Sequence, residues 1–459
     1  MHIRSLTSFA LAFFALGASA PIAQAQAEVA APLVRSGKFT QLHYDGANAA
    51  LADSAVAVVD QVWPLVAAAF GTPDAKPAKP LEIHLYSEVA GYEAAEAQLT
   101  SGRLKRNLAM AHHASRSAHV ALQPPCTDAT LQAIGLPAQT LLLLAWETTH
   151  VARFELCPNY ESHPDWLVDG LASNIAQRVT CKVWGVEPAQ APFWAAHARD
   201  ARALAVDGKL PSVADLLGDK LDALDWHVRY GLRAQWFGFL WSGSRQTKLA
   251  QSLTFARQLG GGPGYAEQLL KHATSAFEGR SGEFTKHLTK LEPQWDEVFR
   301  SLAPRGKDWV QIAFPTSNAI AWNLAPVVGP KLSAKGKLHI LPGGRGQLNF
   351  LFGRSDAGFY SIAFVADYGF TVLAYDSQAD SWTRVHDAEA PNLKLDTPTP
   401  FEVVVSGEDL RVRLAEQSWD VKLPRKLASP VTWGLGAQAG PEGSATGSAG
   451  VWVELVVGK

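Results

Sequence analysis

Cysteine is scarce in this sequence, with only Cys126, Cys157 and Cys181 among 459 residues. In an oxidising compartment at most one disulfide can form from three cysteines, and one thiol is left over. The spacing does not match a zinc ribbon, so we expect one structural bridge and one buried thiol. The sequence leaves the pairing open.

The chain has no excess of charge of either sign. Lysine and arginine number 41, aspartate and glutamate 43, and the net charge is -2. No basic stripe stands out, so we do not expect a nucleic acid as partner. Hydrophobic residues make up 47% of the chain, enough for large cores, and the length predicts two or three domains.

Long apolar runs are missing after the N-terminus. There, "LTSFALAFFALGASA" follows Arg4 and precedes the small residues "AQAQA", which predicts a signal peptide over residues 1–27. The segment has no twin arginine and no nearby cysteine, so we expect no lipid anchor. No later stretch reaches ~18 apolar residues, so no membrane span is expected, and the predicted location is secreted or periplasmic.

The remaining chain changes its pattern near residues 303–309. Before them, helical spacing dominates, with one helix predicted to end at Gly71, short strands at 81–86 and 117–122, and a helix break at "GGGPG", residues 260–264. After them, "FEVVV", "LRVRL", "WDVKL" and "VWVEL" alternate, with "SGED" as a hairpin turn. We therefore predict an α+β protein, in which a mainly helical domain with a small sheet (28–305) precedes an all-β antiparallel sandwich of jelly-roll type (310–459).

The helical part contains a short motif with metal-site spacing. In "LLLLAWETTH", residues 146 and 150 lie four apart and share one face of a helix, with Glu147 between them. "SHPDWLVDGLAS" follows, where Ser162 and Asp165 have capping-box spacing, and it places Asp169 one turn inside a second helix.

These two motifs resemble the peptidase MA-like, gluzincin-type metallopeptidases. That family carries H-E-x-x-H followed by W-L-x-E-G-x-A, in which both histidines and the later glutamate bind zinc and the first glutamate is the general base. The resemblance implies that Glu147 is the base, that His150 is the second zinc ligand and that Asp169 stands at the third. It covers roughly residues 34–302.

The first zinc ligand of the family is replaced by Trp146, whose indole has no lone pair to offer a metal. A catalytic zinc normally has three protein ligands, and these motifs supply at most two. We therefore expect a degenerate, zinc-free site and an inactive enzyme, with zinc regained weakly by Trp146→His and better by adding Asp169→Glu. Two alternatives stay open: a chance match in a buried helix, and a working zinc site completed by His163, His112 or His113.

Tyr230 lies on a further predicted helix in "DWHVRYGLRAQWFGFLW". In a zincin cleft Tyr230 or His227 would stabilise an oxyanion, although core packing explains such a tyrosine more simply. In a degenerate cleft Trp146 would contact the ligand.

The segments "GQLNFLFGRSDAGFYSIAF", "WTRVHDAEA" and "VTWGLGAQ" resemble the concanavalin A-like lectin/glucanase sandwich. The resemblance implies sugar binding by aromatic stacking, sometimes with calcium, and Tyr375, Asp376 and Trp382 are the candidates for it. Alternatively, Trp382, Trp419 and Trp452 fill the space between the sheets.

Three functions follow from these patterns. The first is an exported, peptidase-like protein that acts by binding and needs no cofactor. The second is a zinc metallopeptidase with a non-standard ligand set. The third is a glycan- or surface-binding protein that uses its sandwich. The expected partner is accordingly a peptide or a glycan.

Overall fold

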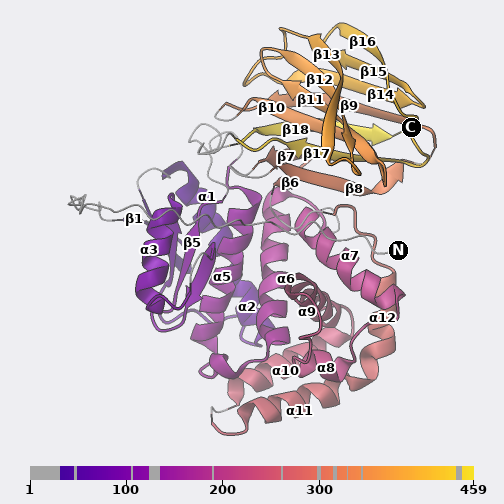
Figure 1. The fold of residues 1–459 in the computed structure, drawn as a ribbon. Helices are drawn as coiled ribbons and strands as arrows, with labels where there is room; N and C mark the ends of the chain where they lie inside the picture. The colour runs from indigo at the N-terminus through magenta and orange to yellow at the C-terminus, as the bar shows by residue number, and fades with distance from the viewer. Residues whose placement is uncertain are drawn as a thin grey trace, which may run out of the picture. The chain divides into compact units, whose positions relative to one another are not determined.

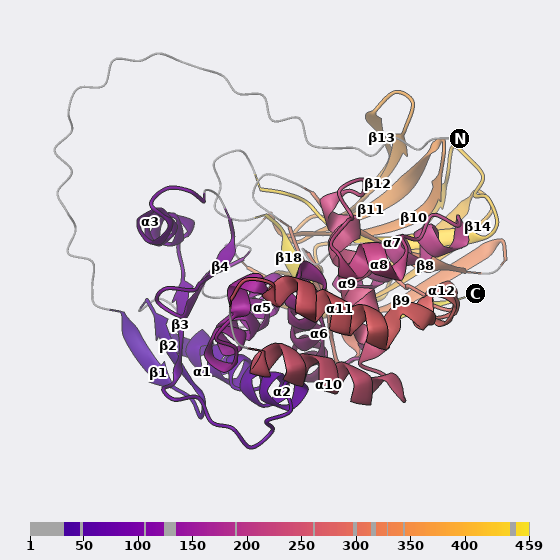
Figure 2. The same cartoon turned by 90° about the horizontal axis from the view of Figure 1, so that it is seen from below.

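The computed structural model describes residues 32–45, 49–104, 107–123, 135–188, 191–259, 262–296, 301–313, 318–327, 329–342, 345–440 and 447–458. The predicted signal peptide and Cys126 lie outside them. Residues 32–459 form one compact unit, which contains helices, a small mixed sheet and two large antiparallel sheets (Figures 1 and 2). The predicted α+β class is confirmed at this level.

The small sheet has five strands in the order β1-β2-β3-β5-β4. Its centre is parallel, since β3 pairs in parallel with β2 and β5, while β1 and β4 run antiparallel at the two edges. The strands at 81–86 and 117–122 were predicted and are confirmed. The bounds are β1 Leu33–Ser36, β2 Thr40–Tyr44, β3 Leu81–Tyr86, β4 Ala109–His112 and β5 Ser117–Ala121.

The helix predicted to end at Gly71 is two helices, α1 (Ala49–Val59) and α2 (Val62–Ala69). The break falls at Asp60, whose carboxylate accepts hydrogen bonds from the backbone of Lys38 and Phe39 and from the hydroxyl of Thr40. These three donors belong to the loop before β2 and the start of that strand. They would lack this hydrogen-bond partner if the helix continued through Asp60. Residues 51–69 are long and apolar enough to span a membrane, but half of this stretch is buried inside the protein, as in a core helix.

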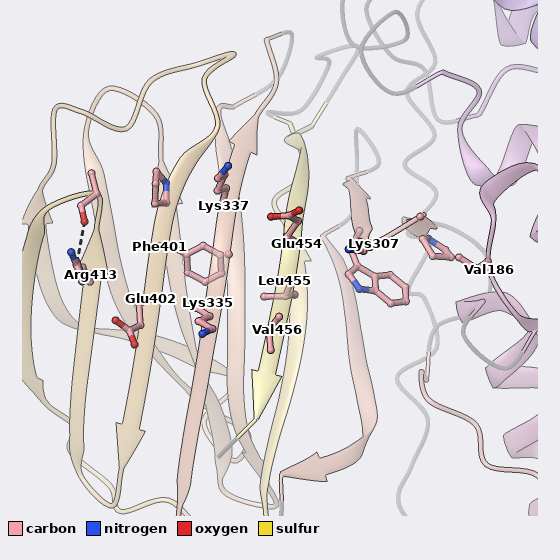
Figure 3. A pocket seen from close by; sticks show the side chains of 16 residues that line it. Val186, Lys307, Lys335, Lys337, Phe401, Glu402, Arg413, Glu454, Leu455 and Val456 are labelled. Atoms are coloured by element: carbon pink, nitrogen blue, oxygen red, sulfur yellow. Dashed lines mark hydrogen bonds between the residues drawn. The ribbon is translucent and has the colours of Figure 1, made fainter.

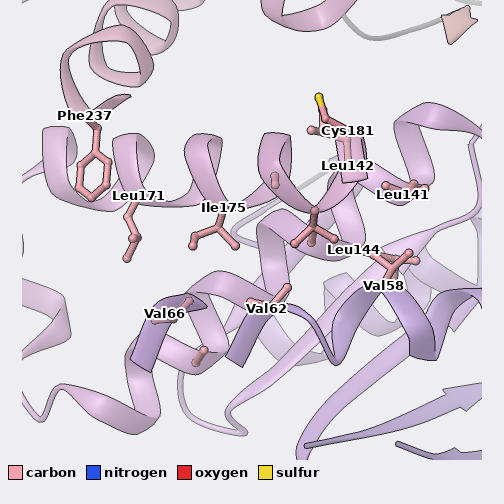
Figure 4. Close-up of a cluster of buried hydrophobic side chains, with 14 of the residues drawn as sticks. Val58, Val62, Val66, Leu141, Leu142, Leu144, Leu171, Ile175, Cys181 and Phe237 are labelled. Carbon is pink, nitrogen blue, oxygen red and sulfur yellow. The ribbon is translucent and has the colours of Figure 1, made fainter. Parts of the chain in front are cut away.

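Long helices form the core of the helical part. The remaining bounds are α3 Val89–Thr100, α5 Ala138–Leu156, α6 Asp165–Trp184, α7 Pro192–Val206, α8 Val213–Leu217, α9 Trp226–Leu240, α10 Arg245–Gln258, α11 Tyr265–Phe277 and α12 Ser281–Thr289. Leucines and valines of α1, α2, α5 and α6 interlock around Leu144 and Ile175, both with no exposed surface (Figure 4). Burying each such side chain contributes about 1.5–3 kcal/mol.

One glycine sets the distance between α6 and α9. A Cβ on Gly170 would lie 2.7 Å from the Cβ of Phe237 and 3.0 Å from the carbonyl oxygen of Arg233. Only a residue without a side chain allows this approach, which brings the α9 side chains within reach of Asp169. The capping box expected at Ser162 is not formed: Pro164 is the N-cap of α6, and Asp219 accepts the amide of Asp165 instead, at 2.8 Å.

All strands after residue 301 belong to two antiparallel sheets, as the alternation predicted. Their orders are β13-β12-β11-β10-β17-β8 and β16-β15-β14-β9-β18-β7-β6. The bounds are β6 Leu302–Arg305, β7 Asp308–Ile312, β8 Ala319–Val327, β9 Lys331–Ile340, β10 Gln347–Ser355, β11 Gly358–Val365, β12 Gly369–Asp376, β13 Ser381–Glu389, β14 Thr399–Ser406, β15 Asp409–Leu414, β16 Gln417–Lys422, β17 Val431–Ala437 and β18 Ala449–Gly458.

The inner faces of the two sheets share a core that includes Phe350, Phe364, Phe401 and the fully buried Trp452. On β18 the neighbouring Val451 points the other way and belongs to the same buried cluster as the helical residues. The predicted independent folding of residues 310–459 stays a prediction, to be checked by expressing that fragment.

Candidate functional site

The zincin-like residues lie on two helices. Trp146, Glu147 and His150 lie on α5, and Asp169 lies on α6. The carboxyl of Glu147 forms a hydrogen bond with the backbone of Ala111 in the edge strand β4. Burial, with a smaller contribution from the charge of nearby Asp169, raises the pKa of Glu147 to about 8. At neutral pH Glu147 is therefore mainly protonated, a form that cannot serve as a general base.

The third-ligand position is already occupied by a cation from the protein. Arg233 of α9 donates to Asp169 at 2.7 Å and to Asp165 at 2.6 Å, and it lies 3.7 Å from Asp219. Arg233 is 6% exposed and Asp169 is 9% exposed. Burial raises the pKa of Asp169 to about 7, while the guanidinium of Arg233 opposes that shift. The positive charge that zinc would bring to this carboxylate comes from Arg233.

The first-ligand position is filled by an aromatic ring. Trp146 lies with its ring centroid 6.4 Å from that of His150 and 6.0 Å from that of Tyr230. Tyr230 in turn contacts Trp226, which is 60% exposed and also contacts His227. Burial lowers the pKa of His150 to about 3 and raises that of Tyr230 to about 12, so both are neutral at pH 7. Tyr230 and His227 thus belong to an aromatic cluster around Trp146.

The candidate rescue ligands have other partners. His163 is buried and lies 3.2 Å from the guanidinium of Arg153. His112 bonds Ser115 at 2.7 Å, and His113 lies 3.7 Å from Glu161. Within the described ranges, no three His, Cys, Asp or Glu side chains form a group that could hold a metal ion.

The two cysteines in the described part of the chain are not bonded to each other. Cys157 and Cys181 are both free thiols and both buried. Burial raises the pKa of each to about 12, so neither is a ready nucleophile or metal ligand. Neither of them therefore forms the bridge that was expected from the sequence.

A groove crosses the outer face of the seven-stranded sheet (Figure 3). Its volume is about 1060 Å³, against about 180 and 70 Å³ for two cavities beside the helices. A pocket that takes a drug-sized ligand has roughly 300–1,000 Å³, so this one has room for several sugar rings or a short peptide. Strands β6 and β7 bound it on one side, and β9, β14, β15 and β18 form its floor. We call it the sheet groove.

The shape of the sheet groove comes from an irregularity in β18. The pairing of β18 with β9 shifts register between Val453 and Val456, and Glu454 adopts a φ of 49° there. The bulge brings the carbonyl oxygen of Val453 to 2.7 Å from where a Cβ on Gly336 would lie, so glycine is required at this position. Such bulges often redirect side chains beside binding sites. Here the bulge leaves Val456 57% exposed in the groove.

The lining of the sheet groove combines apolar and charged side chains. The exposed apolar members are Pro400 and Val456. Trp309 borders the groove, but its ring faces the core between the sheets, where it packs against Trp295 at 4.8 Å between centroids beside its buried cross-strand partner Trp452. The charged members are Lys307, Lys335, Lys337, Arg413, Glu402 and Glu454. None of the six was singled out from the sequence. The alternating lysines of "KLSAKGKL" do place one charged face on β9, but they do not reveal the bulge that makes a groove of it.

The sandwich residues chosen from the sequence lie elsewhere, on the six-stranded sheet. Phe359, Tyr375 and Trp382, on β11, β12 and β13, form a cluster in which each ring centroid lies 5.0–5.3 Å from the other two, and Trp382 is 46% exposed. Trp382 therefore does not fill the space between the sheets, whereas Trp452 does. Asp376 accepts the backbone amides of Gln378 and Ala379, which explains it as a turn residue.

No family model and no curated protein matches this sequence. Solved structures similar to part of the chain include the carbohydrate-binding module CBM66 from Bacillus subtilis, the exoplasmic/lumenal domain of VIP36 and sheep galectin-11. Their identities are 12%, 14% and 9%, and their TM-scores are 0.29, 0.28 and 0.22. They cover 36%, 36% and 28% of this chain and 96%, 83% and 92% of their own.

At TM-scores below 0.5 these similarities carry no functional conclusion. The comparisons give no evidence for a zincin domain, so the peptidase resemblance stays a hypothesis. What the protein does has to be inferred from its own geometry.

Proposed function

We propose that this protein is an exported glycan-binding protein and that the sheet groove holds the oligosaccharide. The observation that carries the proposal is the groove itself, about 1060 Å³ in volume, with the exposed apolar side chains of Pro400 and Val456 among its lining. Sugar rings bind by laying their C–H faces on such apolar groups, while polar side chains fix their hydroxyls. The cluster of Phe359, Tyr375 and Trp382 offers a second surface, which is aromatic.

An extended peptide fits the same groove less well. Peptides gain much of their affinity by pairing their backbone with the free edge of a sheet. The groove crosses the face of the sheet, where β9 is paired on both sides, with β14 and β18. Side chains are therefore what the groove mainly offers, and that suits a ligand rich in hydroxyls.

Calorimetric titration with a panel of soluble oligosaccharides tests the proposal. We expect Val456→Asp to weaken the tightest ligand by at least tenfold, because it puts a carboxylate where the apolar face of a sugar ring would lie. Val456 is 57% exposed, so this variant leaves the packing of the sandwich intact. Trp382→Ala, on the other sheet, is the control. Equal affinities in wild type and Val456→Asp would place the ligand outside the groove.

We further propose that the helical part is a zincin-like scaffold that binds no zinc. The support is the pairing of Asp169 with Arg233, together with Trp146 in place of the first ligand. This pairing changes the expectation drawn from the sequence for Trp146→His and Asp169→Glu. With Arg233 in place, an entering Zn²⁺ would meet a fixed positive charge beside its carboxylate ligand, so we expect neither the single nor the double variant to hold zinc.

Metal content after dialysis checks this expectation. Adding Arg233→Met to Trp146→His and Asp169→Glu should give up to one zinc per chain, since three ligands are then free of competing charge. The matched control adds Arg229→Met, which removes a cation of the same helix that pairs with the exposed Asp222. One zinc per chain in the wild type would refute the zinc-free scaffold.

A further inference from the structure

The charges of the sheet groove are not balanced. Four cations, Lys307, Lys335, Lys337 and Arg413, face two carboxylates, those of Glu402 and Glu454. All four cationic residues are exposed. Across the strands Glu402 stands opposite both Lys335 and Arg413, so a single carboxylate stands in register with two cations. The groove therefore has a net charge of +2 when its six ionisable side chains carry their ordinary charges.

The groove cations also differ from five other cations on the sandwich. Arg354, Arg384, Lys394, Arg411 and Lys422 each have a carboxylate oxygen within 3.1 Å. Among the described residues, no such ion pair is formed by the four groove cations, and Arg413 donates instead to the backbone carbonyl of Ala415 at 3.1 Å (Figure 3). An anionic ligand would thus meet cations that do not first have to leave a partner carboxylate.

Lys335 and Lys337 place two positive charges in line along one strand of the groove. They are two residues apart on β9 and point to the same side, which puts them about 7 Å apart along the strand. Arg413 lies two strands away from Lys335, about 10 Å across the sheet. Cations at these separations reach carboxylates on successive units of a chain rather than one isolated anion.

We infer that the ligand of the sheet groove is an acidic oligosaccharide, one that bears carboxylates along its chain. The inference rests on the proposed glycan-binding function and adds the class of glycan. The carboxylates pair with Lys335, Lys337 and Arg413, and the sugar rings lie on the exposed Pro400 and Val456. An acidic peptide would satisfy the cations but not the apolar surface.

The test compares chains that differ only in charge. Binding of full-length protein to polygalacturonate is measured beside its fully methyl-esterified form, with alginate and hyaluronan as further acidic chains and polyglutamate as an acidic peptide. We expect at least one acidic polysaccharide to bind tenfold or more tightly than the esterified chain and than polyglutamate, with affinity falling as salt rises. Lys335→Gln with Lys337→Gln should remove most of that difference, whereas Lys331→Gln, on the same strand outside the groove lining, should preserve it.

The other possible results of these binding measurements contradict different parts of the inference. Binding of neutral and acidic chains with equal affinity overturns the acidic class and leaves glycan binding intact. Polyglutamate binding as tightly as the best acidic polysaccharide overturns the sugar part of the inference. If neither these chains nor any of the neutral oligosaccharides bind, the proposed function fails together with the inference.

Discussion

Replacing Arg233 with methionine is expected to lower the free energy of unfolding by about 3–5 kcal/mol at pH 8, the cost of breaking a buried ion pair from one side. The variant keeps the bulk of the side chain but leaves Asp169, 9% exposed, without its 2.7 Å partner. Urea unfolding measures the loss. The matched control is Arg229→Met on the same helix, whose pair with exposed Asp222 is worth at most about 1 kcal/mol.

The loss should depend on pH in a defined direction. Without the guanidinium the pKa of Asp169 rises above its present value of about 7, so at pH 5 the carboxyl is neutral and the buried charge disappears. We therefore expect Arg233→Met to cost several times less at pH 5 than at pH 8. Adding Asp169→Leu should recover stability at pH 8. A loss that is equal at both pH values, or equal to that of Arg229→Met, would show that the pair does not hold α6 to α9.

Acid should destabilise the protein through buried histidines well before carboxylates of ordinary pKa titrate. His119 bonds the hydroxyls of Tyr86 and Ser117, and its burial lowers its pKa to about 3. His163 shows the same shift. The unfolded chain takes up these protons near pH 6.5 and the folded protein does not, so the stability is fully present above pH 6.5 and is lost as pH falls toward 3. At pH 5 each histidine accounts for about 2 kcal/mol.

Comparing wild type with His119→Gln and His163→Gln isolates these contributions. Between pH 7 and pH 5 each variant should lose about 2 kcal/mol less than the wild type in urea unfolding, because its pH-dependent term is gone. The raised pKa values of Glu147 and Asp169 act in the opposite sense, and they cancel in the difference between variant and wild type. Identical pH dependence in all three proteins would mean that these histidines accept protons in the folded state.

The sequence predicted the elements well where local patterns decide them. Alternation places β14, β15, β16 and β18, because a strand with one buried face needs an apolar residue at every second position. The break between α1 and α2 escaped prediction because it depends on Asp60 binding a loop about twenty residues earlier. Local periodicity carries no information about such a partner.

The site was predicted only in part, for the same reason. The spacing of Glu147, His150 and Asp169 does place them on two neighbouring helices. That Arg233 neutralises Asp169 follows from the close approach at Gly170, which brings together residues 64 positions apart. The sheet groove was missed because its cations come from β9, β15 and the turn between β6 and β7, which only the register of the seven-stranded sheet brings together.

Affinity electrophoresis measures most directly whether the sheet groove binds a glycan. The native gels contain a dissolved polysaccharide. The proteins compared are the wild type, Val456→Asp in the groove and Trp382→Ala on the other sheet, each run beside a gel without polysaccharide. We expect at least one acidic polysaccharide to retard the wild type and Trp382→Ala but to leave Val456→Asp nearly unretarded. Glycan binding in the sheet groove would be contradicted if retardation survived in Val456→Asp and was lost in Trp382→Ala. It would also be contradicted if no polysaccharide tested retarded the wild type.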